Sequence, residues 1–173
     1  MNFDVYLGVN KKDRLSVALV VKAVVTDTPE TIIPSNLLPL PKLPQCKYRM
    51  YPLVDQMADK VCATLSVYNG YPSTRVKDLV DLVVLTLTQA IDGGRLEVAI
   101  TREAASRGLP FPKTFTAPPD WDASYRKLAS PISDCKDYLT VALATSLVNA
   151  LLEPVLAGKA KGLRWDPKIR AWV

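Results

Sequence analysis

Residues 52–86 constrain the fold more than any other stretch, because they hold two amphipathic helical patterns joined by a turn. In the first pattern, apolar residues recur at steps of three and four over Val54–Val67. Pro52 suits an opening turn because its φ angle is preset, and Asn69-Gly70 favours a left-handed backbone that stops a helix. We therefore predict a helix that begins at Pro52 and is closed by Asn69-Gly70.

The second pattern opens at Pro72-Ser73-Thr74, where a side-chain hydroxyl can accept backbone N–H groups of the first turn. Apolar residues then continue from Val76 to Leu87, and the pattern ends near Asp92-Gly93-Gly94. Most residues after Asp81 are apolar on every side of the helix. We therefore predict a second helix that is deeply buried in the core.

The polar positions of these two helices gather charged side chains of both signs, namely Lys60, Arg75, Lys77, Asp78 and Asp81. Asp78 and Asp81 stand one turn apart, so their carboxylates point the same way. If the helices pack side by side, the amine of Lys60 and both carboxylates converge on one place. Such a cluster can be catalytic, but lysine–carboxylate pairs between packed helices are also common structural features.

Composition narrows the classes of function. The 173 residues suit one domain, or one domain with an appendage, and the apolar content of 49% is ample for a core. The chain has no histidine, and its three cysteines form no CxxC pair, which excludes the usual zinc sites and histidine-based catalysis. We expect a reduced, cytoplasmic protein without a signal peptide or a membrane-spanning segment.

The net charge of +5 is concentrated at the two ends of the chain. Residues 158–173 carry five basic residues and one acidic residue, and residues 1–50 also have a basic excess, whereas residues 51–157 are slightly acidic. A surface for phosphates is therefore more plausible at the ends than in the middle. The alternative is that these lysines and arginines only keep the protein in solution.

Two β-like runs begin the chain, at Phe3–Val9 and Arg14–Val25. The second is rich in Val and Leu, which favours a strand in a sheet that is covered on one or both faces. Two strands alone are marginal in water, so they need further strands, a helical partner or another copy of the chain. Five prolines within residues 26–44 predict an extended connector that wraps the surface.

Further helices are predicted at Leu96–Ala105, from Asp120, and at Cys135–Leu156. The tail, with Trp165 and Trp172 around Asp166-Pro167, favours a short β-ribbon. The resulting fold class is α+β. A small, incomplete N-terminal β-sheet in residues 1–50 is expected to pack on a bundle of about four or five helices in residues 51–173.

Several motifs carry a resemblance to a known family. They are YPLVDQMADKVCAT, PSTRVKDLVDLV, SRGLPFPKTFTAPPDW, LLEPVLAG and the closing RWDP. Together they resemble the C-terminal two thirds of AbiEii-type (MenT-like) nucleotidyltransferase toxins of type IV toxin–antitoxin systems, from about Val5 onward.

The resemblance implies that Lys60 and Asp78 are active-site residues, and that Arg75 and Asp81 belong to the same signature. It implies transfer of a nucleoside monophosphate from an NTP to an acceptor such as the 3′ end of tRNA, with Mg²⁺ and NTP required for activity. In a complete site, Lys60 would bind the triphosphate, Asp78 would orient that lysine or bind the base or ribose, and Arg75 and Lys77 would meet phosphate. Further expected partners are a cognate antitoxin and, because the N-terminal β-sheet is incomplete, a second copy of the chain in a homodimer.

The sequence also departs from the family pattern. Family members carry a Gly-Gly or Gly-Ser turn followed by an Asp-x-Asp pair, and this sequence has no such motif. A further acidic position expected after the VYLG segment falls near Ala18. Because two-metal phosphoryl transfer depends on such carboxylates, three readings remain open: a nucleotidyltransferase completed by a partner chain or by further sequence, an inactive remnant that binds NTP, RNA or an antitoxin, and a pure interaction module.

Overall fold

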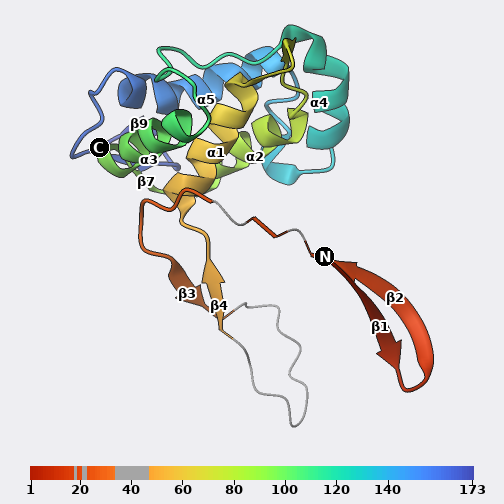
Figure 1. Ribbon diagram of the computed structural model, residues 1–173. Coiled ribbons are helices and arrows are strands. Elements are labelled where there is room, and N and C mark those ends of the chain that lie inside the picture. Colours follow the sequence, from red (N-terminus) through yellow and green to blue (C-terminus); the bar gives the residue numbers. More distant parts are fainter. Residues whose placement is uncertain (18, 21–22, 34–46) are drawn as a thin grey trace.

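The computed structural model describes residues 1–17, 19–20, 23–33 and 47–173, so most of the predicted proline-rich connector and Ala18 lie outside the described residues (Figure 1). The described residues contain five α-helices and several small antiparallel sheets, which confirms the α+β class. The helices are α1 (Leu53–Leu65), α2 (Val76–Thr88), α3 (Gly93–Ser106), α4 (Asp122–Ala129) and α5 (Val141–Leu156). The strands are β1 (Asn2–Leu7), β2 (Asn10–Ser16), β3 (Glu30–Ile32), β4 (Tyr48–Met50), β5 (Val67–Tyr68), β6 (Tyr71–Pro72), β7 (Ile91–Asp92), β8 (Arg164–Asp166) and β9 (Ala171–Trp172).

Helix α2 lies at the centre of the helical body and packs against α1, α4 and α5 (Figure 1). Its residues Leu79, Leu82 and Val83 are completely buried, as predicted for the second helical pattern. The core continues through α3 and α5, where Ile100 and Leu151 are also fully buried. Burial of such side chains contributes about 1.5–3 kcal/mol each, so this body supplies most of the stability. Within the described residues, none of the helices has the length and apolarity needed to cross a membrane.

The prediction that Asn69-Gly70 closes the first helix is wrong. Helix α1 follows Pro52 as predicted but ends at Leu65. Asn69 and Gly70 instead form the turn of the β5–β6 hairpin, with φ angles of 52° and 83°. The same dipeptide that stops a helix is also a strong signal for a two-residue hairpin turn, and here the short flanking strands decide between the two.

The other helix boundaries shift by a few residues. Helix α2 begins at Val76 and ends at Thr88, inside the predicted limits. Helix α3 begins at Gly93, where the Asp92 carboxylate accepts a hydrogen bond from the Arg95 backbone. The predicted helix Cys135–Leu156 is shorter at its start, because Ser133–Cys135 form a separate 3₁₀ turn and α5 begins at Val141.

The β1–β2 hairpin is exposed along its whole length, and it extends away from the helices (Figure 1). Phe3, Val5 and Leu15 share one face, while Asp4 on the other face pairs with Lys11 and Arg14. Strand β2 ends at Ser16, and the described residues between Val17 and Val25 form no strand, so the prediction of a covered strand over Arg14–Val25 is wrong. Ala18, Val21 and Lys22 lie outside the described residues. An apolar run indicates that a strand can be buried, but not that a neighbour covers it.

A second hairpin, β3–β4, was not predicted, and the chain before it is held to the helical body. The buried Asp55 of α1 accepts hydrogen bonds from the backbone N–H and the hydroxyl of Thr26 and from the backbone N–H of Asp27. Asp27 also pairs with Arg95 of α3 at 3.0 Å. One carboxylate of the first helix therefore fixes the entry of the N-terminal part into the body.

The predicted C-terminal ribbon is confirmed, and β7 adds a third strand to it. The indole of Trp165 is 1% exposed and donates to the Thr86 carbonyl at 2.8 Å, while Trp172 donates to the Leu151 carbonyl at 3.2 Å. The two rings meet edge to face with centroids 5.7 Å apart. Gly93 is required beside this ribbon, because a Cβ atom there would lie 2.2 Å from the Ala160 carbonyl oxygen.

Candidate functional site

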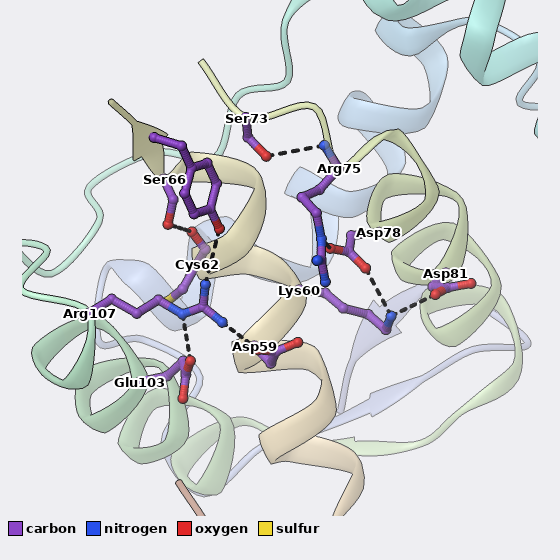
Figure 2. Close-up of polar contacts among 11 residues, drawn as sticks. Asp59, Lys60, Cys62, Ser66, Ser73, Arg75, Asp78, Asp81, Glu103 and Arg107 are labelled. Carbon is purple, nitrogen blue, oxygen red and sulfur yellow. Dashed lines mark hydrogen bonds and ion pairs between the residues drawn. The ribbon is translucent and has the colours of Figure 1, made fainter. Parts of the chain in front are cut away.

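The packing of α1 against α2 brings Lys60 to the first turns of α2 (Figure 2). The Lys60 Nζ atom lies 3.2 Å from Asp78 Oδ1 and 2.6 Å from Asp81 Oδ2. Asp78 and Asp81 point the same way because they are one helical turn apart. The predicted convergence of one cation with two carboxylates is therefore present in the structure.

Asp78 is the most buried member of this cluster, with 7% of its side chain exposed. Its second oxygen accepts a hydrogen bond from Arg75 Nε at 2.9 Å. Arg75 precedes α2 and is more than half exposed, so it can turn toward solvent or a ligand. A buried carboxylate is costly unless both oxygens have partners, and Asp78 meets this requirement through Lys60 and Arg75.

Lys77 completes the predicted set, on the rim of the same site. All five predicted residues line one hollow of about 520 Å³, together with Thr74, Val76, Ser124 and Leu128. Among the residues that the structure describes, Lys77 forms no ion pair with a carboxylate. The wall from α4, with Ser124 and Leu128, was missed by sequence reasoning because no local pattern links α4 to α2.

The electrostatics of the hollow keep its lysine charged. Burial would lower the pKa of Lys60, but the hydrogen bond to Asp81 and the charges of Asp78 and Asp81 outweigh it, so the pKa is raised above 10.5. The hydrogen bond and charge of Asp78 likewise raise the pKa of Arg75. Lys60 therefore cannot act as a general base at neutral pH. Three cations face two carboxylates, which leaves a net positive charge for an anion.

A second ion cluster lies on the other side of α1, to the left of the first in Figure 2. Asp59 pairs with Nη2 of Arg107, and the Nε atom of Arg107 donates to Glu103 at 2.6 Å. The Tyr68 hydroxyl accepts a further, longer bond from the Arg107 guanidinium. Sequence reasoning missed this cluster, because Arg107 lies 48 residues after Asp59 and only the packing of α1 on α3 joins them.

Cys62 lies close to Asp59 in the sequence, and its thiol is not a nucleophile. Its side chain is buried, and burial raises its pKa to about 12. Only the thiolate reacts, so Cys62 is a small core residue, as its position on the inner side of α1 predicts.

The described residues do not fit a magnesium site. Among them there is no cluster of three or more carboxylate, histidine or cysteine side chains that could hold a metal. The oxygens of Asp78 face Lys60 and Arg75, and one oxygen of Asp81 faces Lys60. Mg²⁺ needs carboxylate oxygens that are free to bind it, so we assign no metal-dependent step to these residues.

With this geometry established, the comparisons with known proteins identify the family. The model of the family described as "Nucleotidyl transferase AbiEii toxin, Type IV TA system" matches residues 2–143. The chain belongs to the AbiEii family. The AbiEii match includes the β1–β2 hairpin and both helices of the Lys60 cluster, and it ends in the first turn of α5. The β8–β9 ribbon, with its RWDP motif, therefore lies outside the AbiEii match. No curated protein and no solved structure matches the chain.

Proposed function

We propose that the hollow between α1, α2 and α4 binds the phosphates of an NTP, and that the protein transfers a nucleoside monophosphate to an RNA acceptor such as the 3′ end of tRNA. The observation that supports this most is the Lys60 amine, which is kept protonated between Asp78 and Asp81 beside Arg75 and Lys77. Membership in a family of nucleotidyl transferase toxins supports the class of reaction.

In this proposal, each side chain has a separate role. Lys60 is a fixed positive charge for the phosphates and for the charge that develops on them during transfer. Arg75 and Lys77 reach the outer phosphates from the rim of the hollow. Asp78 is a positioning residue that orients Lys60 and Arg75. Asp81 is one-third exposed, so an incoming phosphate can replace it as the partner of Lys60.

The transfer itself forms a bond between an acceptor hydroxyl oxygen of the RNA and the α-phosphorus of the NTP and breaks the bond from that phosphorus to the bridging oxygen of the β-phosphate. Pyrophosphate leaves, and the hydroxyl proton passes to solvent. We assign the carboxylates for Mg²⁺ to a partner chain or to further sequence, because the described residues do not supply them. As the toxin of a type IV system, the protein would act in the cytoplasm and have a cognate antitoxin.

A second candidate is a catalytically inactive remnant that binds a nucleotide, RNA or the antitoxin. The ion pairing of Lys60 also favours this second candidate, because its amine already has two carboxylate partners within 3.2 Å. A site that is neutralised internally binds phosphate more weakly, because the ligand must displace a carboxylate. A pure interaction module that uses its helical face is the third candidate.

Labelled NTPs and tRNA separate these candidates. We expect the wild-type chain to bind NTP and, with Mg²⁺ and its partners present, to label tRNA. Lys60→Ala and Asp78→Ala should each lower transfer by roughly 100-fold or more, and the matched control Lys113→Ala, an exposed site outside the hollow, should not. NTP binding without transfer would support the inactive remnant. Full transfer in both variants would show that the site assignment is wrong.

A further inference from the structure

The C-terminal ribbon, residues 158–173, is an anchored platform for positive charge. Its inner side is fixed by Trp165 and Trp172, whose indole N–H groups both donate to helix carbonyls. Arg164 and Val173 close the ribbon with two backbone hydrogen bonds of 2.8 and 2.9 Å. The backbone of this segment is therefore ordered before any partner binds, which reduces the entropy lost on association.

Exposed cations are the second feature of the ribbon. Five basic residues are exposed along it: Lys159, Lys161, Arg164, Lys168 and Arg170. Within the described part of the chain, none of these five forms a salt bridge with a carboxylate. The single acidic residue of the ribbon, Asp166, accepts a hydrogen bond from the backbone N–H of Lys168. Arg170 donates a hydrogen bond of 2.7 Å to the Tyr138 hydroxyl. This hydroxyl is uncharged, so the positive charge of Arg170 stays uncompensated.

We propose that this basic ribbon is a binding surface for the phosphate backbone of RNA. Unpaired, exposed cations on a rigid segment match a chain of phosphates, because each contact releases counterions and costs little reorganisation. The choice of RNA rests on the proposed function, in which an RNA is the acceptor. A membrane surface is less well matched, because Trp165 is turned into the core and is not available to enter a bilayer.

The ribbon is also independent of the hollow. None of its residues lines the hollow that contains Lys60, so it would hold the body of the RNA while the hollow holds the nucleotide. This separation predicts that loss of the ribbon charges raises the KM for RNA and leaves kcat unchanged. Substitution of Lys60 is expected to have the opposite effect: it lowers kcat and leaves the KM for RNA unchanged.

The test compares two full-length variants with the same net charge. Lys159→Gln, Lys161→Gln and Lys168→Gln together remove three ribbon charges, and Arg102→Gln, Lys113→Gln and Lys127→Gln remove three exposed charges elsewhere, so each variant falls from +5 to +2. Deletion of the ribbon is unsuitable because it would remove the buried Trp165. Equal thermal midpoints establish that both variants fold.

Binding to tRNA is measured by fluorescence anisotropy over a series of salt concentrations. The ribbon variant should bind about tenfold more weakly, and its slope of log K against log salt should fall by about 2, at roughly 0.7–0.9 per lost phosphate contact. The control variant should stay within about twofold. Equal losses in both variants, or no loss in either, would overturn the proposal.

Two further probes address other polyanions. Vesicles of phosphatidylserine and phosphatidylcholine stand for a membrane, and polyglutamate stands for an acidic protein. If the ribbon variant loses binding to either probe but keeps its affinity for tRNA, the RNA proposal is refuted. These binding measurements do not require transfer activity, so the proposed function and the role of the ribbon can fail separately.

Discussion

Two ion clusters contain consecutive residues of α1. Their comparison distinguishes a structural tie, meaning an ion cluster that only stabilises the fold, from an ion cluster that can bind a ligand. Asp59 belongs to the cluster of Glu103 and Arg107, and Lys60 belongs to the cluster of Asp78 and Asp81. Both combine lysine or arginine with aspartate or glutamate at hydrogen-bonding distance. By composition alone they are equivalent.

Their surroundings differ. Arg107 spans two helices and reaches Tyr68 of the β5–β6 hairpin, so one cation joins three elements and two carboxylates. The Lys60 cluster has the additional cations Arg75 and Lys77 and faces a hollow. An excess of positive charge together with an accessible volume suits an anion, whereas a single cation that joins three packed elements and is balanced by two carboxylates suits stability.

The largest effect on stability is expected from Arg107→Met. This change leaves Asp59 and Glu103 without their shared cation, and because the Glu103 side chain is only 10% exposed, loss of its partner costs about 3 kcal/mol. Urea unfolding followed by circular dichroism measures the loss. NTP affinity of the folded variant should stay within about twofold. Unchanged stability with lost NTP affinity would place Arg107 in the ligand site and remove the distinction between the clusters.

A smaller loss, about 2 kcal/mol, is expected from Lys60→Met, because one oxygen of the buried Asp78 carboxylate loses its partner. Asp78 keeps its bond to Arg75, and Asp81 is exposed enough to be solvated. The same urea titration gives the value, and Arg107→Met serves as the reference. NTP affinity should fall at least tenfold. A loss in stability as large as that of Arg107→Met, with intact NTP binding, would make the Lys60 cluster a structural tie as well.

The smallest expected effect is a change, at alkaline pH, in the difference in unfolding free energy between wild type and Lys60→Met. The pKa of Lys60 is raised in the folded protein above its ordinary value of 10.5. Its stabilising contribution is therefore fully present below pH 10.5 and is lost as the pH rises through the folded pKa. Unfolding of wild type and Lys60→Met should differ most at pH 7 to 10 and converge above that range. A constant difference at every pH would show that charge pairing is not the cause.

Much of the helical body follows from local sequence periodicity. Apolar steps of three and four residues place α1, α2, α3 and α5, because these helices bury one stripe or most of their surface. The incorrect predictions fall where one sequence pattern is compatible with two different structures. Asn69-Gly70 suits a helix end and a hairpin turn equally, and the apolar run Arg14–Val25 suits a strand whether or not a neighbour covers it. Local sequence contains no information on the covering partner.

The candidate site was predictable in part for the same reason. Asp78 and Asp81 share a face through helical spacing, and Lys60 needed only the packing of adjacent helices to reach them. The Arg107 cluster and the α4 wall of the hollow depend on contacts between elements far apart in the sequence. Such contacts follow from the tertiary arrangement of α3 and α4, which no short-range pattern specifies.

The position of Trp165 has a consequence for synthesis on the ribosome. The indole that fills the space beneath Thr86 is translated 79 residues after Thr86, and β8, which pairs with β7, is translated after all five helices. Until they leave the exit tunnel, the carbonyl of Thr86 lacks its donor and one side of the nascent body is open to water. A nascent chain of this protein therefore completes its core only after the residues of β8 have emerged from the ribosome.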